Sequence, residues 1–137
     1  MGRILAIDYG KKRVGLAVTD PLQLICTGLP TVPTNDVFAF IKNYLAQEEV
    51  DSFVIGESKN LDNTKSQVAD AIEEFADKLN RLYPSIPMHW VDERFTSKMA
   101  KQSMLMSGMK KKKRQQKEIV DEISATLILQ TYLQKTQ

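Results

Sequence analysis

The sequence has 137 residues, which is the length of one domain of ordinary size. Its 42% hydrophobic and 26% charged residues are typical of a globular protein with a buried core and argue against a disordered chain. Cys26 is the only cysteine, which excludes an internal disulfide framework and a zinc site built from thiolates. No apolar run approaches membrane-spanning length and no secretory leader precedes the first strand, so we expect a cytoplasmic protein with one domain over residues 1–137.

The first part of the chain predicts three strands joined by short turns. Residues 3–8 and 13–19 are apolar and strand-like, and Tyr9-Gly10-Lys11-Lys12 between them has the composition of a hairpin turn. A third run covers about residues 24–32. Consecutive strands with short turns predict an antiparallel meander.

Beyond these strands, helical patterns alternate with short apolar runs. Residues typical of helix N-termini occur at 34–36, at Thr64 with Gln67, and at Thr96-Ser97, each before apolar residues at helical spacing. We therefore predict helices over about 37–45, 68–82, 98–104 and 118–133, and strands over 52–56 and 86–91.

This order of elements predicts an α/β fold. Strands separated by helices pair in parallel, whereas the first three strands pair antiparallel. We expect a five-stranded mixed sheet, made of an antiparallel meander of three strands plus two parallel strands, with helices on both faces. Open α/β sheets place their chemistry at the carboxyl ends of the central strands, so we expect an active site there.

Acidic residues occur where such a site is expected. Asp8 ends the first strand and is followed closely by glycine, Asp92-Glu93 ends the fifth strand, and Asp121 belongs to the first turns of the last helix. Because successive strand residues face opposite sides, only one of Asp92 and Glu93 can face Asp8. Structural carboxylates at strand ends are common, so a single such acid is weak support for a site.

Three such acids together would form a site rich in hard oxygen ligands, which favours Mg²⁺ or Mn²⁺. Hydrolysis of a phosphodiester needs an activated water, a stabilised leaving oxygen and neutralised phosphate charge, and a pair of metal ions supplies all three. His89, the only histidine, lies within the fifth predicted strand, and we interpret it as structural.

Positive charge is concentrated in one segment. Between Phe95 and Lys117 the chain has no acid and eight basic residues, while the remainder has 11 basic and 17 acidic residues. The eight are Lys98, Lys101, Lys110, Lys111, Lys112, Lys113, Arg114 and Lys117. Such asymmetry is expected of a contact with a phosphate backbone, although a solvated lysine run on a loop has the same composition.

At these motifs the sequence resembles the YqgF family, also called RuvX. The resemblance is carried by Asp8-Tyr9-Gly10-Lys11-Lys12-Arg13-Val14-Gly15 and the residues up to Asp20, by Asp92-Glu93-Arg94-Phe95-Thr96-Ser97, and by Val120-Asp121 with the apolar residues that follow. It extends over nearly the whole chain. It implies a ribonuclease H-like fold in a cytoplasmic bacterial nuclease that matures the precursor of the small-subunit ribosomal RNA.

The resemblance also implies that Asp8, Glu93 and Asp121 are the catalytic acids and metal ligands. Three departures from the family pattern stand out. Gly56-Glu57-Ser58 replaces Gly-Leu-Pro, so Glu57 and Asp92 remain alternatives to Glu93 as the second carboxylate. Residues 60–64 lack a usual glycine, although asparagine tolerates positive φ. Ser124 replaces a common alanine.

Basic residues near the acids are candidate substrate contacts. Lys11, Lys12 and Arg13 follow Asp8 in the first turn, and Arg94 follows Glu93. Lys110, Lys111, Lys112, Lys113 and Arg114 follow Gly108 and predict a basic loop that closes over a nucleic-acid strand. Surface solubility and structural ion pairs are the alternative roles. No base-reading motif is visible, so we expect recognition by backbone charge and shape.

Other functions remain open on the sequence alone. Sugar kinases and actin-like ATPases share an opening D-x-G strand pair, but they need two such domains, which 137 residues do not supply. A non-catalytic RNA-binding factor for ribosome assembly is a second alternative. A Holliday junction resolvase is a third and would need two active sites, hence a dimer. For the nuclease we expect a monomer or a weak homodimer.

Overall fold

The computed structural model describes residues 2–57, 68–92 and 117–136, and in the last helix it describes side chains from Ile123 to Lys135. Five strands form one sheet in the order β3-β2-β1-β4-β5. The strands are β1 (Arg3–Tyr9), β2 (Arg13–Thr19), β3 (Cys26–Pro33), β4 (Val50–Glu57) and β5 (Met88–Asp92). β2 pairs antiparallel with β1 and β3, whereas β4 pairs parallel with β1 and β5. The predicted mixed sheet is confirmed.

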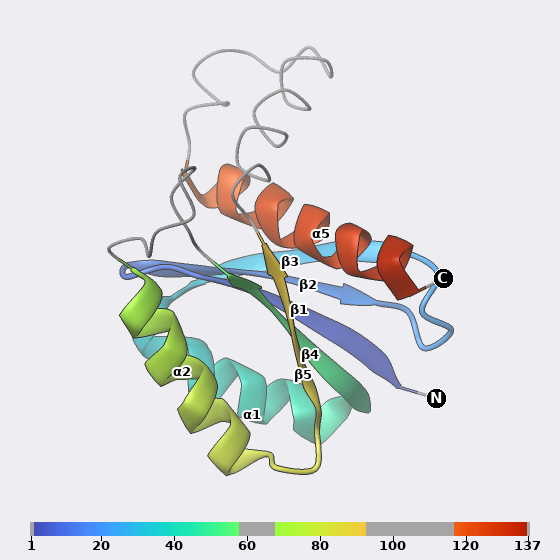
Figure 1. Cartoon of the computed structure of the whole chain (residues 1–137), viewed down its shortest axis with the longest axis horizontal. Helices are drawn as coiled ribbons and strands as arrows, with labels where there is room; N and C mark the ends of the chain where they lie inside the picture. The colour runs from blue at the N-terminus through green and yellow to red at the C-terminus, as the bar shows by residue number, and fades with distance from the viewer. Residues whose placement is uncertain (1, 58–67, 93–116, 137) are drawn as a thin grey trace.

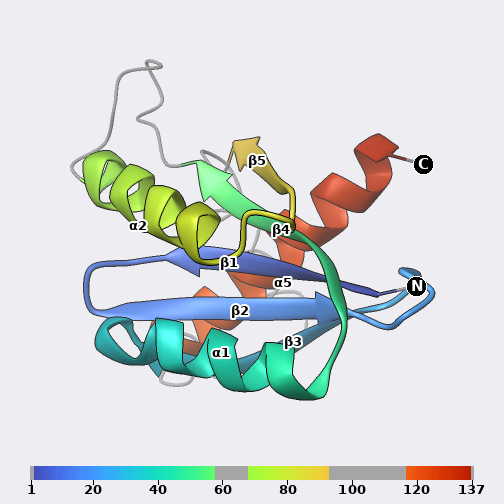
Figure 2. The same ribbon diagram turned by 90° about the horizontal axis from the view of Figure 1, so that it is seen from below.

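Helices cover both faces of this sheet (Figures 1 and 2). The helical elements are η1 (Thr34–Asp36), α1 (Val37–Gln47), α2 (Ala69–Leu82) and α5 (Lys117–Thr136). α1 and α2 lie on one face, and α5 crosses the other. The predicted capping box at Thr64 and the predicted helix after Thr96-Ser97 lie outside the described residues.

Each face of the sheet has its own core, because neighbouring strand residues point to opposite sides. Leu5, Ile7, Leu16, Phe53 and Ile55 pack with α1 and α2, which contribute Val37, Ile41, Ile72, Phe75, Ala76 and Leu79. On the other face Ile4, Ala6, Ala17 and Val54 pack against Ala125, Ile128, Leu129 and Leu133 of α5. The two cores therefore show which face of the sheet each strand residue belongs to, and the position of the acidic residues is described below on this basis.

At three of the boundaries that differ from the sequence prediction, hydrogen bonds of the described residues show what forms instead. The residues expected to cap α1 form the short 3-10 helix η1, and the Asp36 side chain makes no cap hydrogen bond. β3 begins at Cys26 rather than at residue 24, because the Asp20 carboxylate accepts the backbone N–H groups of Leu24 (2.8 Å) and Ile25 (2.7 Å) and holds them in a loop. β5 begins at Met88 rather than at residue 86, since the Ile86 N–H donates to the Tyr83 carbonyl.

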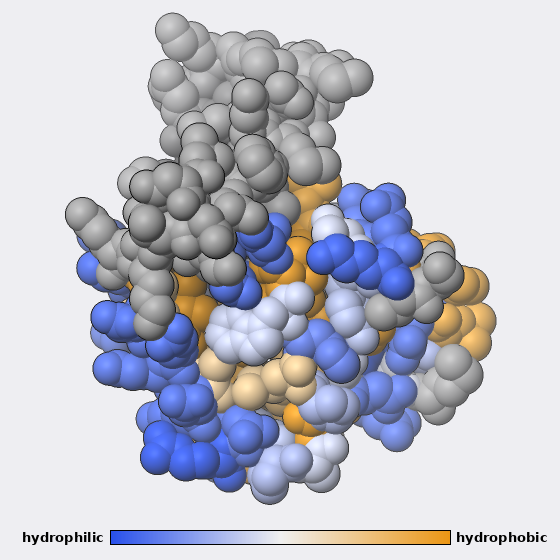
Figure 3. All heavy atoms as spheres, in the orientation of Figure 1, coloured by the Kyte–Doolittle hydropathy of each residue, from blue (hydrophilic) through white to orange (hydrophobic). Residues whose placement is uncertain are grey.

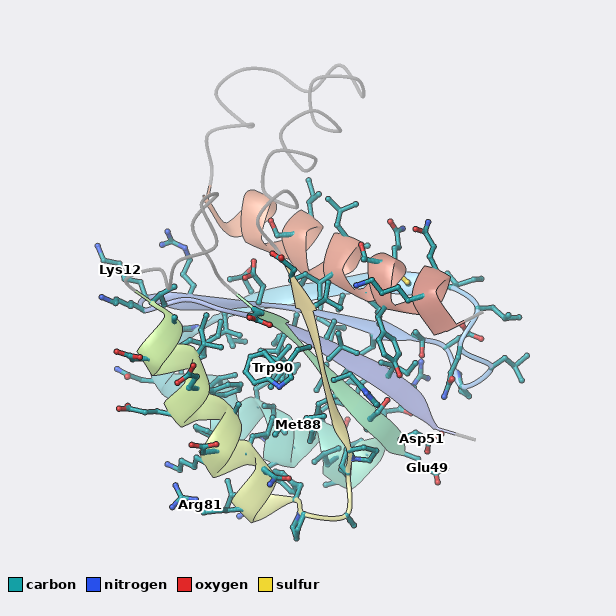
Figure 4. The ribbon with its side chains drawn as sticks, viewed as in Figure 1. Lys12, Glu49, Asp51, Arg81, Met88 and Trp90 are labelled. Carbon is teal, nitrogen blue, oxygen red and sulfur yellow. The ribbon has the colours of Figure 1, made fainter. Side chains whose placement is uncertain are left out.

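Polar groups are tied together at the end of the sheet where β1 begins. The Gly2 N–H donates to Asp51 Oδ2 (2.9 Å), and a Cβ at Gly2 would lie 2.5 Å from Asp51 Oδ1. The Ile4 N–H donates to Oγ1 of the buried Thr19 (2.9 Å). Arg3 Nε pairs with Glu48 Oε2 at 3.2 Å. We call this group of hydrogen bonds the tied end of the sheet; Glu49 and Asp51 mark it in Figure 4.

Within the described residues, no helix is both long enough and apolar enough to cross a bilayer.

Candidate active site

The carboxyl ends of β1, β4 and β5 meet at the edge of the sheet opposite the tied end. Each of these strands carries an acid there: Asp8 on β1, Glu57 on β4 and Asp92 on β5. Glu57 and Asp92 are partners in the β4–β5 pairing, and all three acids are half-buried. The predicted position of Asp8 at the tip of a central strand is confirmed.

Asp8 has glycine on both sides in the sheet. Its partner in the antiparallel pairing with β2 is Gly15. The parallel pairing of β1 with β4 ends with Ile7 beside Ile55, so the next position of β4, beside Asp8, is Gly56. Glycine within a strand commonly marks a place where a ligand or another backbone approaches closely. The two positions directly beside Asp8 in the sheet are therefore both glycines, and both are buried.

The strand register separates Asp8 from the other two acids. Ala6 and Val54 pack under α5, so Asp8 and Gly56, two residues further along, belong to the α5 face. Phe53, Ile55 and Met88 pack on the α1–α2 side, so Glu57 and Asp92 belong to that opposite face. Neither alternative second acid shares the face of Asp8.

The beginning of α5 lies over this edge of the sheet, and its end lies near the tied end (Figure 1). α5 runs opposite to β1 and packs over β1, β2 and β3. Position 121 precedes the buried residues Ser124 and Ala125 by about one helical turn. The backbone of the last helix therefore brings position 121 to the end of the sheet where Asp8 lies.

The turn between β1 and β2 is braced against η1. A Cβ at Gly10 would lie 2.6 Å from the Arg13 carbonyl oxygen, so this tight turn requires glycine. Thr34 Oγ1 donates to the Gly10 carbonyl (2.6 Å), and the Thr34 N–H donates to the Lys12 carbonyl (3.1 Å). Lys11 and Lys12 are exposed on this fixed turn, and Figure 4 shows Lys12 at the outer end of the molecule.

Several predicted site residues lie outside the described residues: Glu93, Arg94, Lys110, Lys111, Lys112, Lys113 and Arg114. For Asp121 the backbone is described but not the side chain. Among the described residues, no three His, Cys, Asp or Glu side chains are grouped as metal ligands. The rings of His89 and Tyr132 are tilted against each other, with their centroids 5.1 Å apart, on the α5 side of β5.

Gly15 and Gly56 were not predicted as part of the site. The signal was visible, since an isolated glycine within a strand pattern indicates a bulge or a close approach. The role of Gly56 could not be inferred from this signal, because it depends on the pairing of β1 with β4, and α1 is one of the elements that separate these strands in the chain. Only the register shows that both glycines lie beside Asp8.

The fold and the relatives of this chain define its class. The structure is similar to RuvC from T. thermophilus, solved in complex with a Holliday junction substrate, with a TM-score of 0.58, 15% identity, and coverage of 98% of this chain and 96% of RuvC. That likeness shows a ribonuclease H-like fold. With the relatives described next, it defines a nuclease of the ribonuclease H-like class, a hydrolase of phosphodiester bonds.

The chain belongs to the RuvX family. The model of that family, described as "RuvX: Holliday junction resolvase", matches residues 2–135. A protein of Bacteroides thetaiotaomicron named "Putative pre-16S rRNA nuclease" is 53% identical over 134 residues, which cover 98% of this chain and 97% of that protein. A protein of the same name from Christiangramia forsetii is also 53% identical, over 97% of this chain and 98% of its own length.

Proposed function

We propose that this nuclease is metal-dependent and processes the ends of the 16S ribosomal RNA precursor, with Asp8, Glu93 and Asp121 as its catalytic acids. The observation that carries the proposal is the place of Asp8, at the carboxyl end of the central strand, flanked by Gly15 and Gly56 on the face covered by α5. The names of the relatives support the choice of RNA.

Strand alternation supports Glu93 as the second acid. Val91 packs under α5, on the same face as Asp8, and Asp92 belongs to the other face. If the alternation continues, position 93 returns to the face of Asp8. Glu57 and Asp92 are disfavoured by the same reasoning.

Helical spacing supports Asp121 as the third acid. Positions 121, 124, 125 and 128 share one face of a helix, and Ser124, Ala125 and Ile128 are buried against the sheet. An acid one turn before them would lie beyond the packed stripe, at the end of the sheet where Asp8 lies.

This donor set fits Mg²⁺ or Mn²⁺. The proposed ligands are all carboxylates, and hard oxygen ligands suit these ions. Gly15 and Gly56 place no side chain of their own beside Asp8. Bound ions would supply an activated water and neutralise charge on the phosphate. Asp8, fixed in position on β1, would hold such an ion together with the other two acids.

Basic residues would hold the flanking phosphates. Lys11 and Lys12 lie on the braced turn beside Asp8, with Arg13 at the start of β2. We propose that they contact the phosphate backbone close to the cut, and that Arg94 and residues Lys110, Lys111, Lys112, Lys113 and Arg114 add contacts further along the strand. Such contacts do not depend on base identity.

We further propose that residues 1–137 form one nuclease domain that acts in the cytoplasm as a monomer or a weak homodimer. One sheet with a helix layer on each face accounts for all the described elements.

The test compares the wild type with Asp8→Asn on labelled 16S precursor RNA, plain single-stranded RNA and a four-way DNA junction, each with Mg²⁺, Mn²⁺ or chelator. Asp36→Asn is the matched control, because it removes the same charge from an exposed side chain without a cap hydrogen bond. We expect metal-dependent cleavage of the precursor, reduced at least about 100-fold by Asp8→Asn and unchanged by Asp36→Asn. Equal cleavage by the wild type and Asp8→Asn would refute the assigned site.

Junction resolution is the alternative that the family description supports. Symmetric cleavage of a four-way junction needs two active sites and therefore a dimer. Preference for the DNA junction over the precursor, together with a dimer in sedimentation, would select it. If the protein binds RNA and cuts no substrate with any metal, it is a non-catalytic assembly factor.

A further inference from the structure

Arg13 begins β2 on the face of the sheet that carries Asp8. In β2, Val14 packs on the α1–α2 side, whereas Ala17 packs under α5. Strand residues alternate between the two faces. Arg13, which precedes Val14 by one residue and Ala17 by four, therefore belongs to the α5 face. The same reasoning placed Asp8 there from its own strand.

The register of β1 and β2 places Arg13 diagonally opposite Asp8. Asp8 pairs with Gly15, so Arg13 lies two residues from the partner of Asp8, on the side of the turn. Diagonal neighbours on one face of an antiparallel pair are about 7–8 Å apart, which is within reach of a long side chain. Asp8 is also the only acid in β1 and β3, the two strands that adjoin β2. A guanidinium at position 13 can therefore reach a phosphate that is held over Asp8.

The two lysines of the turn are placed differently from Arg13. Lys11 and Lys12 are exposed, whereas Arg13 is half-buried at the start of its strand. The outer end of the molecule, where Figure 4 labels Lys12, has a hydrophilic surface (blue in Figure 3). The backbone of Arg13 is held on both sides, because its carbonyl lies against Gly10 and its strand partner on β3 is Pro33. The lysines thus face solvent, and the arginine lies on the sheet beside the acid.

We infer that Arg13 contacts the reacting phosphate itself and stabilises its charge in the transition state, whereas Lys11 and Lys12 bind the flanking phosphates. This inference rests on the proposed function and adds a catalytic residue to its acids. As water attacks, it loses a proton, a new P–O bond forms and the bond to the leaving oxygen breaks, so negative charge grows on the phosphate oxygens. A guanidinium donates two parallel N–H groups to such oxygens, which an ammonium does not.

The first test compares cleavage of the RNA precursor by charge-removing variants. Arg13→Gln should lower kcat about 100-fold and change KM less than about fivefold, because it removes a contact that strengthens in the transition state. Lys12→Gln should mainly raise KM, since a flanking contact is equally strong before and during the reaction. Lys42→Gln is the control, because Lys42 is exposed on α1, and it should change neither constant. If Arg13→Gln also changes only KM, the inference is refuted.

The second test measures binding and needs no catalysis. Asp8→Asn protein without metal is titrated with labelled RNA strands in which one phosphate at a time is a neutral methylphosphonate, with deoxyribose at that position in the strand and in its control. Anisotropy gives the Kd, and departure from additivity gives the coupling between a side chain and a phosphate. We expect Arg13→Gln to couple at least about threefold to the linkage that the wild type cuts, and Lys12→Gln to a neighbouring linkage. Coupling of Arg13→Gln to a flanking linkage alone, or to none, would overturn the inference.

The two proposals fail separately. If the wild type cuts RNA and Asp8→Asn does not, yet Arg13→Gln behaves as Lys12→Gln does, the role of Arg13 is wrong and the nuclease assignment stands. If no substrate is cut with any metal, the catalytic assignment is wrong and the role of Arg13 falls with it. Circular dichroism shows whether each variant folds. Should Arg13→Gln not fold, Arg13→Lys decides: it keeps the charge but not the planar fork, so a lower kcat supports the inference and a wild-type kcat refutes it.

Discussion

The two ends of the sheet are built for different purposes. At the tied end, side chains bind backbone groups: Asp51 holds Gly2, Thr19 holds Ile4, and Asp20 holds the loop before β3. At the other end, Asp8 stands between two residues that have no side chains. Side chains at the tied end bind backbone groups of the fold, whereas both positions directly beside Asp8 at the site end are glycines. Substitutions at the two ends should therefore separate stability from activity.

The largest effect is expected from adding a side chain directly beside Asp8. Gly56→Val places a branched side chain on the α5 face, next to the carboxylate, and should displace the reacting phosphate. We expect kcat/KM to fall about 100-fold, as displacements of about 1 Å commonly do. Gly56→Ala should lower kcat/KM less than Gly56→Val does, because its side chain is smaller.

The control for that substitution is a thermal melt. Gly56 is buried, so the added side chain should also lower the melting temperature by overpacking, and kcat/KM is therefore measured well below that temperature and per folded molecule. If activity falls only in proportion to stability, Gly56 is a packing residue and the comparison between the two ends fails.

The next effect concerns a buried hydrogen bond at the tied end. Thr19→Val keeps the shape of the side chain but leaves the Ile4 N–H without its acceptor. A buried unsatisfied donor costs about 1–3 kcal/mol, so urea unfolding should show that loss. Thr19→Ser keeps the hydroxyl group as an acceptor, so its loss of unfolding free energy should be smaller than that of Thr19→Val. Cleavage per folded molecule should not change; a drop would show that the two ends are coupled.

A smaller effect, dependent on pH, is expected at Asp20. The backbone hydrogen bond from Ile25, aided by those from Leu24 and Leu22, lowers the pKa of the Asp20 carboxyl below its ordinary value. A group whose folded pKa is lowered stabilises the fold above its unfolded pKa, and that contribution disappears as the pH falls through the folded pKa.

Asp20→Asn should therefore melt a few degrees below the wild type at pH 5–8, and the difference should shrink below pH of about 4. Melting curves from pH 2.5 to pH 8 measure it. A difference that is constant down to the lowest pH would show that the charge of Asp20 plays no part.

The smallest effect is expected at the ion pair of Arg3 with Glu48. Both side chains are partly exposed, at 25% and 42%, so solvent screens the pair. Glu48→Gln should cost no more than about 0.5 kcal/mol in urea unfolding, and 1 M salt should remove the difference. A cost above 1 kcal/mol would mean that the pair holds the tied end together.

Local patterns were enough to predict the order of strands and helices and the position of Asp8, because alternation and helical spacing are properties of neighbouring residues. The start of β3 was misplaced because the Asp20 side chain competes for backbone N–H groups that a strand would use. The flanking glycines were missed because their role depends on pairing between distant strands. The sequence left Glu57 and Asp92 open as second acids, and only the register of β4 and β5 places both on the face opposite Asp8.

The position of α5 has a consequence for synthesis on the ribosome. The apolar face of the sheet that carries Asp8 is covered by residues 125–133, close to the end of the chain. Those residues follow all five strands in the chain, so they leave the ribosome after the strands have done so. The nascent sheet must therefore wait with one apolar face open until α5 has emerged, and the face that carries Asp8 is the last to be covered.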